Sequence, residues 1–365
     1  IYYQLFIMSC ILQPTDDSIS RITSLLSLNE LVILPKESVY NFVVNINDIK
    51  NIKRIYSIKK RNNDNPLTVN VADFKTCLKY SDLTKIEEIL VNKLTEEFWP
   101  GQLAIVCKAK NMGNTVNTTK NNSISFTSPS NQYFRKILDT LDIPLLSTSA
   151  NISGQVSCSH IDHITHYFKN IANLTILDNI TPTKYGTEGT ILKIERNEIT
   201  ILRQGYPSIT KIKQVVNLLE GEYVFKSITD TPIPHGVSKS HYTINKKIKL
   251  ANFIKYTDDT LIEKNKLEII KATEVYLNKN IFIDFNKKNI HLIDLFQGYV
   301  DLSESGDIQE AIFNLYNVLH QLTNIECDHI LLFNVYNNDS EFYNIMNDRV
   351  SKICDSEHIL IPLFN

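Results

Sequence analysis

The residues best suited to chemistry lie in one polar segment, residues 146–154, which is rich in serine and asparagine. It follows the apolar run 143–146, which is typical of the end of a buried strand. A strand that ends in serine, asparagine and glycine is a common binding place for phosphate and carboxylate groups in α/β folds. Hydroxyls and an amide can donate hydrogen bonds there, and Gly154 allows a sharp turn. The alternative is a polar turn before a helix, with Ser157 or Ser159 as its N-cap.

Two cations, Lys59 and Arg61, lie two residues apart and precede the apolar stretch 67–71. A flexible ammonium and a planar guanidinium together suit an oligophosphate. The alternative is a basic helix end that complements the helix dipole. A third segment, 97–103, holds the single tryptophan, Trp99, followed by a Pro-Gly turn.

In this order, these segments resemble the threonylcarbamoyl-AMP synthases, the YrdC-type proteins. The motifs that carry the resemblance are Pro35–Asn41, Lys59 and Arg61 with Asn65-Pro66-Leu67, Trp99-Pro100-Gly101, Ser149-Ala150-Asn151, Glu188–Ile191 and Leu202–Gly205. A histidine–tyrosine pair in the linker-like segment 234–242, and the motifs at 301–307 and 346–350, resemble the long, two-domain form of the family. The resemblance therefore extends over most of the chain.

The resemblance implies an L-threonylcarbamoyladenylate synthase, a nucleotidyltransferase that joins L-threonine, bicarbonate and ATP and releases pyrophosphate. Its product supplies a second enzyme, a threonylcarbamoyl-transferase that modifies tRNA, so tRNA is an indirect partner. Mg²⁺ is expected as a companion of ATP, and no protein metal site is expected. Such a reaction depends on positioning and charge neutralisation more than on a protein nucleophile.

The resemblance places the nucleotide side of the site on residues that this sequence retains. The expected catalytic residues are Lys59, Arg61, Ser149 and Asn151. The expected ATP-binding residues are Arg61, Asn65, Ser123, Ser149, Ser157, Arg203 and Tyr242.

The threonine side departs from the family. The expected threonine-binding positions are Ser38, Asn70, Thr127, Ser147 and Gly189. Of these, Asn70 replaces a histidine, Thr127 replaces an arginine and Gly189 replaces a serine. Losing a charge-assisted bond to a carboxylate costs about 1.5–3 kcal/mol, although Lys36 could supply a substitute charge. We expect weaker threonine binding or altered substrate choice, and the alternative function is a nucleotide-binding pseudoenzyme or regulator with a degraded threonine pocket.

Hydrophobic periodicity predicts an α/β (α+β) protein. Helices are predicted at 18–28, 47–60, 82–98, 131–141 and 308–322, and strands at 31–34, 103–107, 143–146, 191–194, 199–202, 281–285 and 329–335. The family implies that the first part is a twisted, mixed, open sheet with a concave nucleotide site. Alternating strands and helices predict a small Rossmann-like domain at the C-terminal end.

Four regions are predicted along the chain. They are an N-terminal extension at 1–15 with its native start at Met8, a YrdC-like catalytic domain at 16–211, a linker or lid at 212–246, and the Rossmann-like domain at 247–365. The first apolar run is too short to span a bilayer, which takes about 20 residues.

Composition excludes several classes of protein. The ten glycines form neither a P-loop nor a dinucleotide fingerprint, so any ATP is bound by other means. A net charge of −2 disfavours a general nucleic-acid-binding surface. The sequence lacks the Gly-x-Ser-x-Gly motif, which argues against a serine hydrolase of that type. Six scattered cysteines without a C-x-x-C pair favour a cytoplasmic protein. His160, His163 and His166 are three apart, which fits a surface helix better than a metal site.

Overall fold

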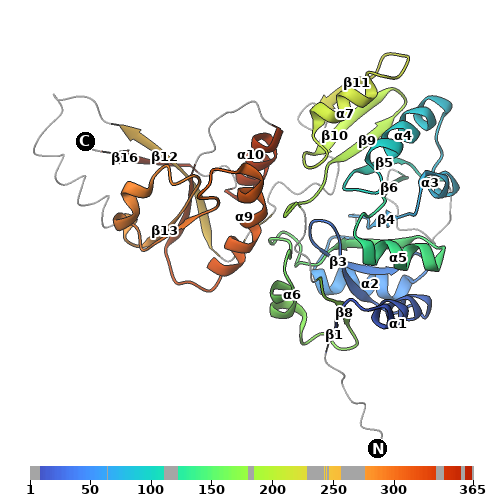
Figure 1. Cartoon of the computed structure of the whole chain (residues 1–365), viewed down its shortest axis with the longest axis horizontal. Coiled ribbons are helices and arrows are strands. Elements are labelled where there is room, and N and C mark those ends of the chain that lie inside the picture. The colour runs from blue at the N-terminus through green and yellow to red at the C-terminus, as the bar shows by residue number, and fades with distance from the viewer. Residues whose placement is uncertain are drawn as a thin grey trace, which may run out of the picture. The chain divides into compact units, whose positions relative to one another are not determined.

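The computed structural model describes residues 9–63, 65–110, 122–179, 185–227, 242, 244, 246–255, 276–333, 341–354 and 358–363. The chain forms two compact units. The first comprises Ile1–Ser153 and Ser157–Val237, and the second comprises Gly154–Val156 and Ser238–Asn365. Each unit is built on its own sheet, so the two are described separately (Figure 1).

The first unit contains an 11-stranded mixed sheet in the order β1-β8-β2-β3-β7-β4-β6-β5-β9-β10-β11. Its strands are β1 (Cys10–Leu12), β2 (Val32–Pro35), β3 (Tyr40–Asn45), β4 (Thr68–Asn70), β5 (Ala104–Lys108), β6 (Ser123–Thr127), β7 (Leu145–Ser149), β8 (Thr175–Leu177), β9 (Ile191–Glu195), β10 (Glu198–Arg203) and β11 (Val224–Ser227). At its centre, β7 runs antiparallel to both β3 and β4, and β4 runs parallel to β6. The predicted mixed open sheet is confirmed.

The helices of this unit, apart from the one at Ile161–Phe168, begin where an N-cap side chain accepts a backbone hydrogen bond. They are α1 (Asp16–Ser27), α2 (Ile49–Lys59), α3 (Phe74–Tyr80), α4 (Lys85–Phe98), α5 (Gln132–Leu141), α6 (Ile161–Phe168) and α7 (Ile209–Val216). Asp48 accepts a hydrogen bond from the third residue of α2, and Thr84 and Glu87 form a capping box at the start of α4. The cap at Asp48 fixes where α2 begins, and therefore where Lys59 lies at its other end.

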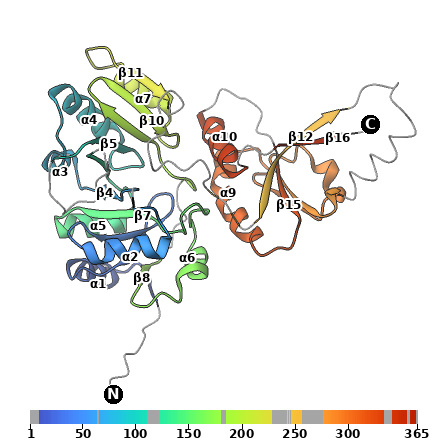
Figure 2. The same ribbon diagram turned by 180° about the vertical axis from the view of Figure 1, so that it is seen from behind.

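Alternating side chains along the central strands pack into separate cores on the two faces of the sheet. Val43 and Leu145 pack with α1 and α5, whereas Phe42 and Leu146 pack with α2 and α6. A third core joins α4 and α7 to β5, β9 and β10. Figure 2 shows the same elements from behind, with α4 and α7 again side by side. The face that carries Phe42 and Leu146 is thus covered by helices, and α1 and α5 cover the other face at Val43 and Leu145.

The second unit has a five-stranded sheet in the order β14-β13-β15-β12-β16, and each of its pairings is parallel. Its elements are β12 (Lys247–Lys255), β13 (Asn280–Asp284), the 3₁₀ helix η2 (Ile290–Leu295), β14 (Gly298–Asp301), α9 (Ile308–Leu322), β15 (His329–Phe333), α10 (Glu341–Ile353) and β16 (His358–Leu363). Alternation of parallel strands and helices is the pattern of a Rossmann-like domain. The predicted apolar face of α9, which includes Leu315 and Leu319, is buried.

Several differences from the predicted elements concern the site and its borders. The strand predicted to end at residue 146 runs on to Ser149, because β3 and β4 pair with it beyond the apolar residues. The first unit also extends past residue 211, since α7 crosses this position and β11 pairs with β10. Likewise, β1 joins the sheet through β8, although residues 1–15 were predicted to form an extension. The predicted start at Met8 lies outside the described residues, as do residues 228–241, 243 and 245 of the predicted linker.

Candidate functional site

The end of α2 and the end of β7 meet at Lys59. Its ammonium Nζ donates to the carbonyl oxygen of Ser149 at 2.5 Å, to the carbonyl oxygen of Asn151 at 2.7 Å and to Asn151 Oδ1 at 3.4 Å. Ser149 Oγ donates to the same Oδ1 at 2.6 Å. Three of the four residues expected to be catalytic are therefore in direct contact, although Lys59 and Ser149 are 90 residues apart in the sequence.

The Lys59 side chain is 1% exposed, which sets the electrostatics of this cluster. Burial lowers the pKa of Lys59 well below its ordinary value, and the positive charge of Arg61 lowers it further. Three acceptors match the three protons of an ammonium, which opposes that shift. The carboxylate of Glu188 also acts against it. The cluster thus provides a buried nitrogen donor to two main-chain carbonyl groups at the end of β7.

Arg61, the fourth expected catalytic residue, organises the turn that follows α2. Its Nε donates to the carbonyl oxygen of Asn65 at 3.0 Å, and a terminal nitrogen donates to the carbonyl oxygen of Pro66, also at 3.0 Å. The Tyr56 hydroxyl donates to the Asn65 carbonyl at 2.6 Å. The side-chain Oδ1 of Asn65 is buried and has no partner within the described structure. Arg61 and Asn65 are therefore neighbours, as the motif suggested.

Two further expected nucleotide positions, Ser157 and Arg203, contact Glu188 and Gly189, of which only Gly189 was predicted from the sequence to belong to the site. Ser157 Oγ donates to Glu188 Oε1 at 2.6 Å, and both side chains are buried. Arg203 Nε donates to the carbonyl oxygen of Gly189 at 2.9 Å. Glu188 was not among the predicted site residues, although its carboxylate acts electrostatically on Lys59. The sequence signal that could have identified Glu188 is its acidic side chain within a motif that also contains an expected site residue.

Three of the five expected threonine positions, Asn70, Thr127 and Ser147, occupy one face of the central sheet. Asn70 on β4 is directly beside Thr127 on β6, and Ser147 on β7 is beside Thr68 on β4. Cross-strand partners and residues two apart point to the same face. Asn70, Thr127 and Ser147 are all buried. The structure thus groups two of the three positions that depart from the family.

Lys36 extends this group. Its Nζ donates to Asn70 Oδ1 at 3.3 Å, so an amino group lies at the side chain that replaces the family's histidine. Burial lowers the pKa of Lys36; the carboxylate of Glu37 opposes this shift, and the positive charge of Arg203 adds a smaller lowering effect. The adjoining turn, which contains the buried Ser38, is held by Glu37, whose carboxylate accepts from the backbone N–H of Ser130. Ser130 follows β6 by three residues, so this turn lies near the Thr127 end of that strand.

Two expected ATP positions stand apart from these contacts. Ser123 begins β6, four residues from Thr127, which is about 13 Å along a strand. Tyr242 belongs to the second unit, where its ring stacks on Tyr316 with centroids 5.3 Å apart and the Arg349 guanidinium lies 5.4 Å from its ring centre. Contact of either residue with ATP stays a prediction.

The histidine triplet has a local role at the start of α6. His160 is the N-cap, and His163 Nδ1 accepts from the backbone N–H groups of Ser159 at 3.3 Å and His160 at 3.4 Å. Among the described residues, no group of three or more His, Cys, Asp or Glu side chains is placed to hold a metal ion. Within the same residues, no helix is both long and apolar enough to cross a membrane.

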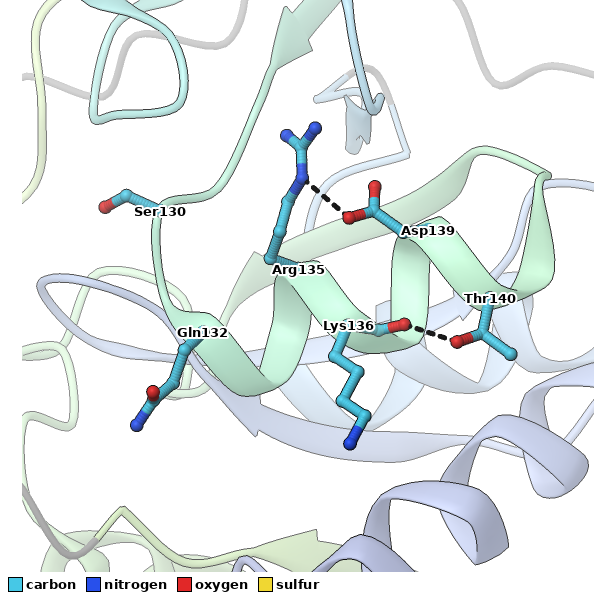
Figure 3. Close-up of a pocket in the computed structure, with 6 residues that line it drawn as sticks. All are labelled: Ser130, Gln132, Arg135, Lys136, Asp139 and Thr140. Atoms are coloured by element: carbon cyan, nitrogen blue, oxygen red, sulfur yellow. Dashed lines mark hydrogen bonds and ion pairs between the residues drawn. The ribbon is translucent and has the colours of Figure 1, made fainter.

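A surface depression of about 470 Å³ lies along the outer side of α5 and is separate from these residues (Figure 3). Its lining includes Arg135 and Asp139, whose side chains form an ion pair at 3.1 Å. Arg135 also donates to Ser128 Oγ at 2.8 Å, beside Thr127. None of the predicted site residues lines the depression.

Comparison with known proteins relates the first unit to the family that its sequence motifs resemble. Residues 24–205 match the Sua5_yciO_yrdC family model, described as telomere recombination. The chain is 29% identical over 234 residues to a threonylcarbamoyl-AMP synthase of Bacillus subtilis, covering 63% of this chain and 66% of the relative. It is 26% identical over 221 residues to one of Pyrococcus abyssi, covering 58% and 62% respectively. These matches thus span less than two thirds of each relative.

The fold comparison covers both units. The crystal structure of P. abyssi Sua5 complexed with L-threonine matches with a TM-score of 0.78 and 21% identity, over 97% of this chain and 100% of that one. The structure of a doubly substituted P. abyssi Sua5 matches with a TM-score of 0.75. The mixed sheet, the parallel-stranded unit and the buried basic cluster define a two-unit α/β protein of the Sua5 fold. Through its first unit, the chain belongs to the Sua5/YciO/YrdC family.

Proposed function

We propose that this protein is an L-threonylcarbamoyladenylate synthase, which makes threonylcarbamoyl-AMP from L-threonine, bicarbonate and ATP. The observation that carries the proposal is the cluster of Lys59, Ser149 and Asn151 with Arg61 nearby, in a chain whose relatives bear that name. The P. abyssi structure that shares the fold was determined with L-threonine. A buried basic cluster beside a polar strand end suits a triphosphate.

In this proposal, bicarbonate provides the carbon dioxide to which the amine of threonine adds. The proton lost by the amine and the hydroxide lost by bicarbonate leave together as water, and the resulting carbamate attacks the α-phosphate of ATP in line. Pyrophosphate leaves, and negative charge grows on the phosphate oxygens. Arg61 stabilises that charge. Lys59 fixes the segment 149–151 by donating to the carbonyl oxygens of Ser149 and Asn151. Ser149, Asn65, Ser157, Ser123 and Arg203 orient the nucleotide. Positioning and preorganised charge therefore supply the catalysis.

The amino-acid side of the site uses a changed set of residues. Ser38 and Ser147 retain hydroxyl groups that suit the polar parts of threonine. Thr127 cannot supply the positive charge of the family pattern, and Gly189 cannot supply its hydroxyl. Lys36, held at Asn70 by a 3.3 Å hydrogen bond, offers the substitute cation for the carboxylate of threonine. A cation in this position supports an active amino-acid pocket over a degraded one.

Mg²⁺ would accompany the phosphates of ATP, as is usual for this ion. The described residues offer no acidic or histidine cluster for it, so each step assigned to the chain uses its own side chains. The product would pass to a threonylcarbamoyl-transferase that acts on tRNA, which places the protein in the cytoplasm. Tyr242 would act from the linker as a further nucleotide contact.

The test is pyrophosphate release from ATP by the purified full chain. We expect release that requires both L-threonine and bicarbonate, with threonylcarbamoyl-AMP detected by mass spectrometry. Omission of either substrate is the control, and alanine in place of threonine measures the choice of amino acid. ATP binding without threonine-dependent release would contradict the proposal and favour a nucleotide-binding regulator.

A further inference from the structure

Gln102 carries a buried amide whose polar atoms have no partner. Its side chain is 7% exposed, and neither Nε2 nor Oε1 has a hydrogen-bond partner among the described residues. An amide buried without partners is strongly unfavourable, because it has given up its hydrogen bonds to water. Such a group at a binding site is usually completed by a ligand or by water.

The backbone around Gln102 bridges two of the expected threonine positions. Just before it, the N–H of Gly101 donates to the carbonyl oxygen of Ser128 at 2.8 Å, next to Thr127. Shortly after it, the N–H of Ala104 donates to the carbonyl oxygen of Thr190 at 2.9 Å, next to Gly189. Gln102 therefore lies between the end of β6, where Thr127 departs from the family pattern, and the start of β9, which Gly189 precedes.

Gln102 also occupies the space that a side chain at residue 189 would need. A Cβ added to Gly189 would lie 2.0 Å from the carbonyl oxygen of Gln102 and 2.6 Å from its Cβ. The main chain at residue 102 can approach this closely only because residue 189 is glycine. The serine hydroxyl expected at 189 is absent, and residue 102 beside it carries an amide with a donor and an acceptor.

We propose that Gln102 is a substrate-binding residue of the amino-acid pocket. Its Nε2 donates to the carboxylate of the amino acid, and its Oε1 accepts from the hydroxyl or amine of the same molecule. The ligand class is a small α-amino acid with a second polar group. This inference rests on the proposed function for the location of the pocket, and it adds a residue to those expected from the sequence motifs.

The experiment compares the parent chain with Gln102→Met, which keeps the length of the side chain and removes the amide. Binding of L-threonine, L-serine and L-alanine is measured by calorimetry with a non-hydrolysable ATP analogue present, and the affinity for that analogue is measured alone. Gln132→Met is the matched control, because Gln132 is an exposed glutamine of the same unit. Thermal unfolding of each variant without ligand reports on folding.

We expect Gln102→Met to weaken threonine binding about tenfold or more and to change the affinity for the ATP analogue less than about twofold. Without ligand, its melting temperature should equal or exceed that of the parent, because an unpaired buried amide has been removed. In turnover, the KM for threonine should rise with kcat little changed, because the lost bond serves ground state and transition state alike. The control variant Gln132→Met should match the unsubstituted chain in threonine affinity, ATP-analogue affinity, melting temperature and KM.

Unchanged threonine binding in a folded Gln102→Met variant would overturn the inference and identify a water-satisfied structural amide. If that variant does not fold, Gln102→Asn replaces it, and unchanged binding there would equally overturn the inference. Failure of the proposed function has a different signature, namely no threonine-dependent pyrophosphate release by the parent. Binding of L-serine or L-alanine that depends on Gln102 would then still support the inference. If the unsubstituted chain binds none of the three amino acids, both the proposed function and the inference about Gln102 are contradicted.

Discussion

The basic side chains on the proposed nucleotide side and on the proposed amino-acid side of this site make different kinds of contact. On the nucleotide side, Lys59, Arg61 and Arg203 donate to main-chain carbonyl oxygens. On the amino-acid side, Lys36 instead contacts the side chain of Asn70. Every sequence that adopts the fold presents the same main-chain carbonyls, whereas a side-chain partner changes with one substitution. Under the proposed function, this difference would explain why the basic residues match the family motif while three expected threonine positions do not.

If the comparison is right, Lys59 stabilises the fold as well as the site, and its loss should have the largest effect. Lys59→Met removes a buried donor from the carbonyl groups of Ser149 and Asn151, although the N–H of Asn151 still donates to the Ser149 oxygen at 3.1 Å. The free energy of unfolding should fall by about 1.5–3 kcal/mol, the contribution of hydrogen bonds from a charged donor. Urea denaturation measures the change, with Lys60→Met as the control because Lys60 is exposed. Equal midpoints for the two variants would show that the Lys59 contacts contribute little.

Arg61 should show the next largest effect, on nucleotide affinity. Removing a charged donor to phosphate by Arg61→Ala should weaken ATP binding by about 1.5–3 kcal/mol, roughly ten- to a hundredfold. Lys60→Ala is the matched control, since it removes the adjacent positive charge from an exposed side chain. Similar losses in an ATP titration would mean that the basic segment acts only as a helix end.

Gly189 tests whether the changed pocket is fixed in place. Restoring the family's residue by Gly189→Ser would bring Cβ within 2.0 Å of the Gln102 carbonyl oxygen, so the backbone must move. We expect a loss of about 1–3 kcal/mol in the free energy of unfolding. Gly298→Ser is the control, because a Cβ there meets Ile281 Cγ1 at an ordinary 3.5 Å. A fully stable Gly189→Ser variant with improved threonine affinity would refute a fixed arrangement.

Lys36 should give the smallest of these effects. Lys36→Met should raise the KM for threonine about tenfold, equivalent to about 1.4 kcal/mol, and leave the KM for ATP nearly unchanged. Thr127→Arg in this variant should recover part of the loss if both positions serve the same carboxylate. If the threonine KM of Lys36→Met is unchanged, a residue other than Lys36 binds the carboxylate of threonine.

The charge of Lys36 also predicts a pH dependence. Burial lowers its pKa, so the ammonium loses its proton at a lower pH than an exposed lysine would. Threonine affinity should therefore be highest on the acidic side of this pKa and fall as the pH rises through it. A profile of the threonine KM from about pH 7 to about pH 10 measures this. Lys36→Arg should remove the alkaline loss, because arginine stays protonated throughout that range.

Much of the fold was predictable because its helices carry a strong 3.6-residue pattern. The helix predicted at 47–60 is observed as Ile49–Lys59, and the one at 131–141 as Gln132–Leu141. The strand Tyr40–Asn45 was missed, since it is buried on both faces and therefore shows no alternation. Ser147 to Ser149 were assigned to a loop because their polarity concealed their pairing with β3 and β4.

The site was predictable as a set of residues and not as a set of contacts. Motif order indicated Lys59, Ser149 and Asn151, but their hydrogen bonds to main-chain atoms across 90 or more residues leave no sequence signal. Gln102 was missed for a similar reason. Its significance depends on Gly189, which becomes its neighbour only after β5 and β9 have paired.

The contact between Lys59 and the end of β7 has a consequence for protein synthesis. A nascent chain that has not yet reached Ser149 contains the whole of α2 and its lysine, but not the carbonyl groups that receive the ammonium. The central strand β7 is equally late, and both β3 and β4 need it as a partner. The site therefore cannot assemble until that strand has emerged from the ribosome, and the early strands stay open to other partners during that interval. Truncated chains that end before residue 145 should depend on chaperones more than those that end after residue 205.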